Sequence, residues 1–68
     1  MEQVQRQAVP SELDKSIRAF ERRGFSCQSL SREGQTYAAR LENQAGVPRF
    51  IVCRLNETGN GGECVAYF

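Results

Sequence analysis

The sequence predicts an α+β fold in which one N-terminal amphipathic helix packs on a four-stranded antiparallel sheet, in the order α-β-β-β-β. The first observation is that Leu13, Ile17 and Phe20 recur at the spacing of one helix face within residues 11–23. The second is that apolar and polar residues alternate along the segments that follow. The third is that the connections are short, which favours an antiparallel meander. A chain of 68 residues has room for one small core, so residues 1–68 are expected to form a single domain.

Both ends of the helix over residues 11–23 carry recognisable signals. Ser11 is expected to cap the N-terminus, with Asp14 as the acid of a capping box. Gly24 follows the last periodic residue and suits the left-handed conformation that ends many helices. Phe25 is placed for the hydrophobic contact that accompanies such an end.

The outer face of this helix carries three cations, Lys15, Arg18 and Arg22, opposite the apolar stripe. They form either a ridge that faces phosphate or acidic groups, or a solvated surface. Asp14 and Glu21 lie about one turn from Arg18 and can neutralise it, so the sequence favours the solvated surface.

Strand patterns begin directly after Gly24. Residues 25–32 alternate at first and then slip by one position at Leu30, which indicates a bulge or a strand end. Residues 33–35 (Glu-Gly-Gln) predict a tight turn. Residues 36–42 alternate well, as expected for a strand with one buried face.

The second half of the predicted sheet is more apolar. Residues 49–55 carry apolar side chains at both parities, which is typical of a central strand. Residues 63–68 form the last predicted strand, after a flexible loop over residues 56–62. At the other end of the chain, residues 1–9 are polar and remain open to three interpretations: a flexible lead-in, an extra strand, or an arm that orders on a partner.

The three cysteines, Cys27, Cys53 and Cys64, contain no C-x-x-C pair and no spacing typical of zinc sites. Their odd number, the lack of a secretory signal and the lack of a long apolar run indicate a cytoplasmic protein. Free cysteines that behave as small hydrophobic residues are therefore favoured. A Cys53–Cys64 pairing across a hairpin remains an alternative, as does an intermolecular or metal-binding role.

Composition excludes several classes of function. The chain has no histidine, so it cannot contain a Ser-His-Asp or Cys-His catalytic system or a His-ligated metal site. Its net charge of +1 gives no strong field toward nucleic acid or an anionic membrane. The glycine-rich residues 58–62 lack the spacing of phosphate-binding loops. We therefore expect no enzyme activity, catalytic residue, cofactor, metal, small-molecule substrate or membrane contact.

The predicted architecture leaves one apolar surface uncovered, because one helix covers one face of the sheet while the last two strands are apolar on both. Such a patch marks an interface with another protein or a second copy. Sheet twist together with residues 1–9 offers self-burial as the alternative. The candidate contact residues are Arg40, Phe50, Val52, Arg54 and Tyr67, with Glu57 and Glu63 added for a basic partner.

These observations predict a non-enzymatic module that binds and occludes a larger protein. Phage and mobile-element inhibitors of host defence, including anti-CRISPR proteins, are often domains of this size. The alternative is an RNA or single-stranded DNA binder that uses the same face. In that case Arg40 and Arg54 would supply cations beside Tyr37, Phe50 or Tyr67, whose rings stack on bases.

Overall fold

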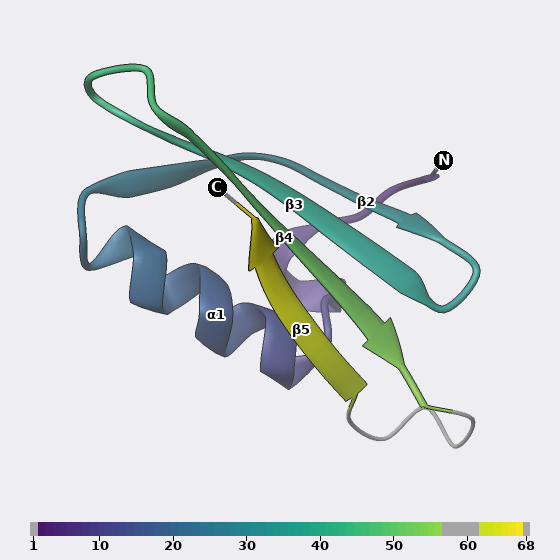
Figure 1. Cartoon of the computed structure of the whole chain (residues 1–68). Helices are drawn as coiled ribbons and strands as arrows, with labels where there is room; N and C mark the ends of the chain where they lie inside the picture. The colour runs from purple at the N-terminus through teal and green to yellow at the C-terminus, as the bar shows by residue number, and fades with distance from the viewer. Residues whose placement is uncertain (1, 57–61, 68) are drawn as a thin grey trace.

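The computed structural model describes residues 2–56 and 62–67, which form one α-helix and a five-stranded antiparallel sheet in the order β1-β2-β3-β4-β5. The predicted α+β class is confirmed (Figure 1). The predicted number of strands is wrong by one, because a short N-terminal strand joins the sheet. The elements are β1 (Glu2–Gln3), the 3-10 helix η1 (Arg6–Ala8), α1 (Ser11–Glu21), β2 (Phe25–Glu33), β3 (Thr36–Asn43), β4 (Pro48–Leu55) and β5 (Gly62–Tyr67).

The start of α1 differs from the sequence prediction. Pro10 occupies the N-cap position in an extended conformation, and its carbonyl accepts a hydrogen bond from the Asp14 N–H at 3.0 Å. Ser11 is therefore the first helical residue, and no side chain caps the helix. Proline suits this place because its ring fixes φ near −65° and its missing N–H leaves no donor to satisfy.

The end of α1 follows the prediction closely. The last regular residue is Glu21, and the N–H groups of Arg23 and Gly24 bond to carbonyls three residues back at 2.9 and 3.1 Å. Gly24 has a φ of +94°, the left-handed region that favours glycine. The ring of Phe25 then packs edge-on against Phe20 at 5.5 Å between centroids, so the predicted hydrophobic contact is confirmed.

Residues 2–9 form an extra strand and a short helix rather than a free arm. β1 pairs with Ser31 and Arg32 of β2 and becomes the edge strand on that side of the sheet. Arg6 then bridges two acids of α1, with its guanidinium 2.8 Å from Asp14 and 3.2 Å from Glu21. The hydrogen bond to Glu21 is the largest cause that raises the pKa of Arg6. The N-terminal segment is thus fastened to both the sheet and the helix.

A β-bulge near Gln28 explains the irregular alternation of β2. Cys27 lies opposite Leu41 and Leu30 lies opposite Ala39, although Cys27 and Leu30 differ in parity. The extra residue between Cys27 and Ser29 shifts the register and brings both side chains to the side of the sheet that faces α1. The slip that the sequence shows is therefore a bulge within β2, not the end of the strand.

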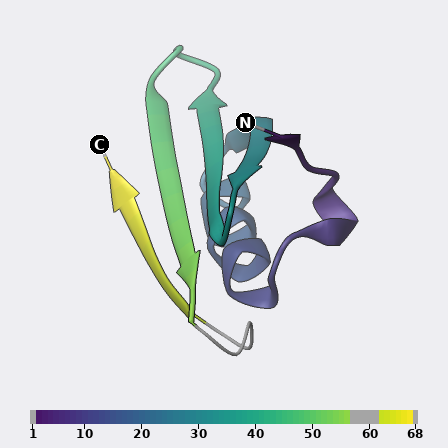
Figure 2. The same ribbon diagram turned by 90° about the vertical axis from the view of Figure 1, so that its right-hand side faces the viewer.

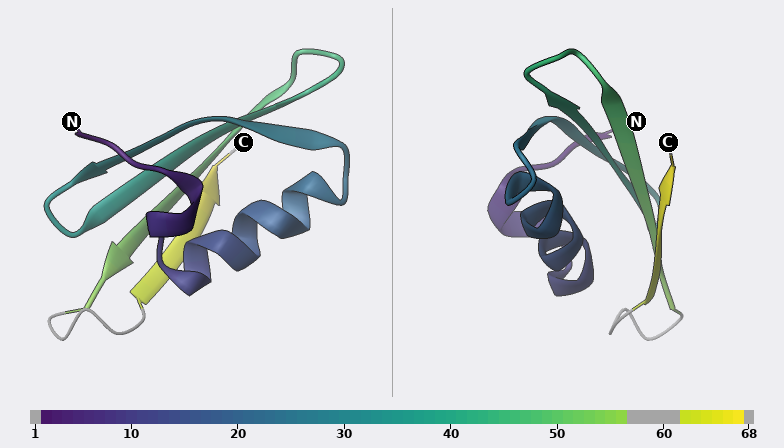
Figure 3. Two further views of the ribbon diagram at one scale, coloured as in Figure 1. Left: turned by 180° about the vertical axis from the view of Figure 1, so that it is seen from behind. Right: turned by 60° about the vertical axis from the view of Figure 1, so that its left-hand side comes forward.

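The core lies between α1 and one face of β3 and β4. Figure 2 shows α1 behind the sheet, and the right panel of Figure 3 shows it on one side only. No helix within residues 2–56 and 62–67 is long and apolar enough to span a membrane. The buried apolar residues, which include the predicted stripe of α1, are Leu13, Ile17, Phe20, Tyr37, Ala39, Leu41, Ile51 and Cys53.

Replacement of Leu41 by alanine tests this core. Leu41 is fully buried, so Leu41→Ala removes apolar contacts and leaves a cavity that costs about 2–5 kcal/mol. A domain of this length has a free energy of unfolding of about 3–10 kcal/mol. Denaturant titration followed by circular dichroism should therefore show most of the stability lost. Val65→Ala, on the exposed side of the sheet, is the control and should change stability by less than about 1 kcal/mol.

Candidate interaction surface

The side of the sheet that faces away from α1 is the candidate site, and we call it the open face. Side chains that lie opposite one another in an antiparallel register share a face, so the pairing of β3, β4 and β5 defines this surface. It lies toward the viewer in Figure 2. Its three cross-strand rows are Arg40–Phe50–Tyr67, Ala38–Val52–Val65 and Thr36–Arg54–Glu63.

The open face exposes large apolar side chains. Phe50, Val65 and Tyr67 are 43%, 49% and 53% exposed, and they are the exposed large hydrophobic residues of the described chain. Phe50 and Tyr67 are directly opposite each other on β4 and β5. Cross-strand aromatic pairs stabilise a sheet modestly, whereas an aromatic pair left in water supplies apolar area that a partner can bury.

A shallow hollow of about 210 Å³ opens beside these rings. Its lining includes the small side chains of Ser29 and Ser31 of β2 and of Ala38 of β3, together with Phe50 and Val52 of β4. Ligand pockets usually enclose about 300–1,000 Å³. This hollow is smaller than that and suits a single side chain inserted by a partner.

Charges on the open face are of both signs. Arg40 forms an ion pair with Glu42 at 3.1 Å between Nη2 and Oε2. Arg54 lies opposite Glu63 in the register, and among residues 2–56 and 62–67 neither side chain forms an ion pair. Glu33 of β2 lies opposite Thr36 in the same row. The face therefore carries one ion pair and three further charges, two of them acidic, not a basic field.

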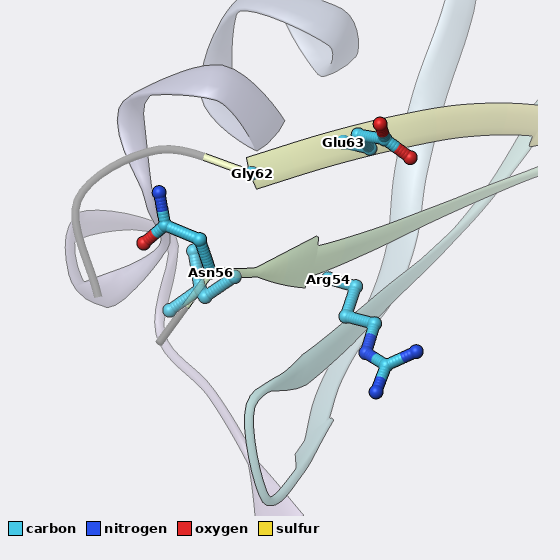
Figure 4. Close-up of a pocket in the computed structure, with 5 residues that line it drawn as sticks. Arg54, Asn56, Gly62 and Glu63 are labelled. Carbon is cyan, nitrogen blue, oxygen red and sulfur yellow. The ribbon is translucent and has the colours of Figure 1, made fainter. Parts of the chain in front are cut away.

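A second hollow of about 260 Å³ lies at the loop end of β4 and β5 (Figure 4). Its lining includes Arg54, Asn56 and Glu63. Glycine is required at position 62, because a Cβ atom there would collide with the backbone carbonyl of Arg54. The charges of Arg54 and Glu63 stand at the rim of this hollow and extend the open face toward the loop.

Six of the seven predicted contact residues come together on or beside the open face. The seventh, Glu57, lies outside the described residues. Tyr37, considered as a stacking ring beside Arg40 and Arg54, lies on the opposite side: it is 7% exposed and packs in the core. The six residues that gather are Arg40, Phe50, Val52, Arg54, Glu63 and Tyr67.

Val65 and the small residues that line the hollow are not among the predicted contact residues. Val65 lies between Glu63 and Tyr67 on the same face of β5, and its parity alone could have identified it. The serines of β2 could not be placed, because the bulge changes which of them share a face with Ala38. The hollow follows from this shifted register.

Cys53 and Cys64 are directly opposite on β4 and β5 and are joined by a disulfide, with 4.0 Å between their Cα atoms. The expectation of three free thiols is therefore wrong, and Cys27 is the free cysteine. The hairpin register explains the pairing, since it brings residues eleven positions apart into one cross-strand pair. The bond lies on the helix side of the sheet and holds β5 against β4.

The outer face of α1 is partly neutralised, by a different arrangement from the predicted one. Asp14 forms an ion pair with Arg18 at 2.9 Å, whereas Glu21 forms its ion pair with Arg6. Lys15 and Arg22 form no ion pair within the described part of the chain. Within that part, no three His, Cys, Asp or Glu residues gather in a way that could hold a metal ion.

Comparison with protein-family models, with curated proteins and with solved structures found no match for this chain.

The cysteine pairing predicts a simple thiol count. Without reductant the denatured chain should react with one equivalent of alkylating agent, and with three after reduction. In the folded chain, desolvation by burial raises the pKa of Cys27, so less of the thiol is ionised at pH 8 than in the denatured chain. Alkylation of the native protein at pH 8 should therefore be slower than that of the denatured protein, and its rate should continue to rise with pH after that of the denatured protein has levelled off.

Intact-mass spectrometry measures both quantities. Cys27→Ser is the control and should abolish all labelling without reductant. Three labels on the unreduced denatured chain would contradict the pairing.

Proposed function

We propose that this protein is a non-enzymatic interaction module that binds a larger protein through the open face and occludes part of its surface. The observation that carries the proposal is the exposed cross-strand pair of Phe50 and Tyr67. This pair lies on a surface that carries charges of both signs, beside a hollow that has room for one side chain. Exposed aromatic residues near the centre of a surface are the usual energetic anchors of protein interfaces.

The balance of charge favours protein over nucleic acid as the partner. Nucleic-acid sites concentrate unpaired cations because phosphates dominate their affinity. On the open face Arg40 is already paired with Glu42, and Glu63 is opposite Arg54. The single-stranded nucleic-acid alternative would leave these acids facing phosphates, which costs affinity.

The rigid sheet gives this surface a fixed shape. The Cys53–Cys64 disulfide holds β5 to β4, so the two aromatic rings and Val65 are presented on paired strands rather than on a loop. A preorganised surface loses little conformational entropy on binding. A small rigid domain of this kind inhibits a larger protein by covering a site, without chemistry of its own.

Inhibition of a host defence system by a phage or mobile element, including CRISPR defence, belongs to this proposal as its biological setting. The support for that setting is the size of the chain and the absence of histidine from its sequence. The partner is therefore sought first among host nucleoprotein complexes.

The central experiment compares matched baits in affinity capture from host lysate treated with nuclease. The wild-type chain should retain a discrete protein that Phe50→Ala and Tyr67→Ala lose. With the purified partner, either substitution should weaken binding by about 2 kcal/mol or more, roughly thirtyfold. Lys15→Ala, on the exposed outer face of α1, is the matched control and should bind as the wild type does.

Two outcomes contradict the proposal. The first is unchanged affinity in folded Phe50→Ala and Tyr67→Ala variants. The second is capture that disappears with nuclease, together with affinity that falls steeply between low and physiological salt, because that dependence identifies phosphate contacts. The second outcome would assign the open face to nucleic acid.

Filling the hollow is a separate test of the binding geometry. Ala38→Leu places a larger side chain in the lining of the hollow, where it faces solvent and leaves the core unchanged. Stability should change by less than about 1 kcal/mol. Affinity for the partner should fall at least tenfold, because the leucine side chain fills the space that the partner's side chain would occupy. Calorimetric titration measures this, and unimpaired binding would show that the hollow lies outside the interface.

A further inference from the structure

The edge of β5 is the strongest remaining feature of the molecule. β5 is the last strand of the sheet and its outer side is unpaired within the described residues (Figure 2). The other edge strand is β1, which has two residues and pairs only with Ser31 and Arg32 of β2, and the Val4 N–H extends this contact by donating to the Leu30 carbonyl at 3.1 Å. β5 is therefore the longer of the two edge strands and offers the longer ladder to a further strand.

This edge carries few of the features by which proteins protect a strand from further pairing, and its charged residue is Glu63. Such features are lysine, proline, bulges or a covering segment. The six residues Gly62–Tyr67 contain neither lysine nor proline, and their pairing with β4 is continuous. Five of the six are exposed, including Val65 and Ala66. An unprotected edge of this length is a template for another strand.

The register fixes which backbone groups are free. The Leu55 N–H donates to the Gln35 carbonyl on the β3 side. Because backbone groups of successive residues in a strand point to alternate sides, the N–H and C=O groups of odd-numbered β4 residues bond to β3, and those of even-numbered residues bond to β5. The narrow Cα spacing of 4.0 Å at Cys53–Cys64 agrees, since pairs without hydrogen bonds are the closer ones. On β5 the N–H and C=O groups of Cys64 and Ala66 therefore point to the open edge.

We propose that a second copy of this chain occupies that edge, with the two β5 strands antiparallel about a two-fold axis at Val65. In this register Cys64 of each copy exchanges hydrogen bonds with Ala66 of the other. The N–H and C=O groups of both residues point to the open edge, so these hydrogen bonds form without any shift of the strand register. A one-residue shift would set an outward-pointing residue against one that already bonds to β4, and would lose these bonds.

Side chains also fit this register. Val65 meets Val65 of the second copy in the close, non-hydrogen-bonded position, where β-branched residues pack well. Glu63, the charged residue of β5, is opposite Tyr67 of the second copy, so no like charges are opposed. On the helix side the contact is between Cys64 and Ala66, which are small enough for the strands to approach.

The dimer is independent of the proposed function, because it forms from the chain alone and uses mainly backbone groups. It would join two open faces into one sheet surface. The measurement is sedimentation equilibrium of the full chain at micromolar to millimolar concentrations, with no partner present. The expected mass at high concentration is twice that of the chain, and a monomer throughout would overturn the proposal.

Ala66→Pro tests the backbone pairing selectively. It removes an N–H that points outward, and proline is tolerated on edge strands where the N–H faces solvent, so the β4–β5 ladder stays intact. The dimer dissociation constant should rise about tenfold or more. Ala66→Ser keeps the N–H and is the matched control. A dimer that is unaffected by Ala66→Pro, with circular dichroism unchanged, would overturn the proposal.

Cross-linking tests the register in a Cys27→Ser background. Val65→Cys should give a disulfide-linked dimer on oxidation, because the two-fold axis brings the two positions together. Tyr67→Cys, equally exposed on the same face, is opposite Glu63 of the second copy and should not cross-link. The reverse pattern would overturn the register. The wild-type chain could instead be a monomer that captures another protein, and Ala66→Pro could abolish that capture. This outcome would overturn the dimer and assign the edge to a strand of the captured partner.

Discussion

The packing of Leu13, Ile17 and Phe20 of α1 against β3 and β4 is the interaction on which the rest of the structure depends. It decides which side of each strand is inside, because neighbouring side chains in a strand point to opposite faces. Once Leu41 and Ile51 face the helix, Arg40 and Phe50 must face away. The exposed aromatic surface is therefore a direct consequence of how the core is built, and within residues 2–56 and 62–67 no second α-helix covers it.

The N-terminal segment supports this arrangement from the side. Arg6 holds Asp14 and Glu21, which lie seven residues apart on α1, and β1 pairs with Ser31 and Arg32 of β2. Surface ion pairs contribute little to stability individually. Their effect here is positional, because they hold the N-terminal segment on the helix side and leave the open face clear.

Much of the fold could be predicted from local patterns. The apolar stripe of α1, the glycine that ends it and the alternation of β3 each depend on neighbouring residues. The features that the sequence did not resolve depend on contacts between distant residues. Pro10 replaces Ser11 as the cap, the place of residues 2–9 is decided by Arg6 and β2, and the disulfide requires the register of the β4–β5 hairpin.

The same distinction holds for the candidate surface. Phe50, Val52 and Tyr67 could be identified because parity along a single strand assigns them to one face. The hollow beside them could not, since its lining includes side chains of β2 whose positions depend on where the bulge falls. Tyr37 was considered for the wrong face because its aromatic type suggested stacking, although its parity with Leu41 places it in the core.

The disulfide also changes how the molecule resists mechanical force. A pull on the C-terminal side of β5, such as an energy-dependent protease applies when it threads a substrate, would open the β4–β5 ladder one hydrogen bond at a time. That opening reaches Cys64 after only three residues of the strand and then meets a covalent bond to Cys53. Cys53 is buried in a central strand under α1. The load therefore passes from the weakest edge of the sheet to its core, and the whole domain must yield at once.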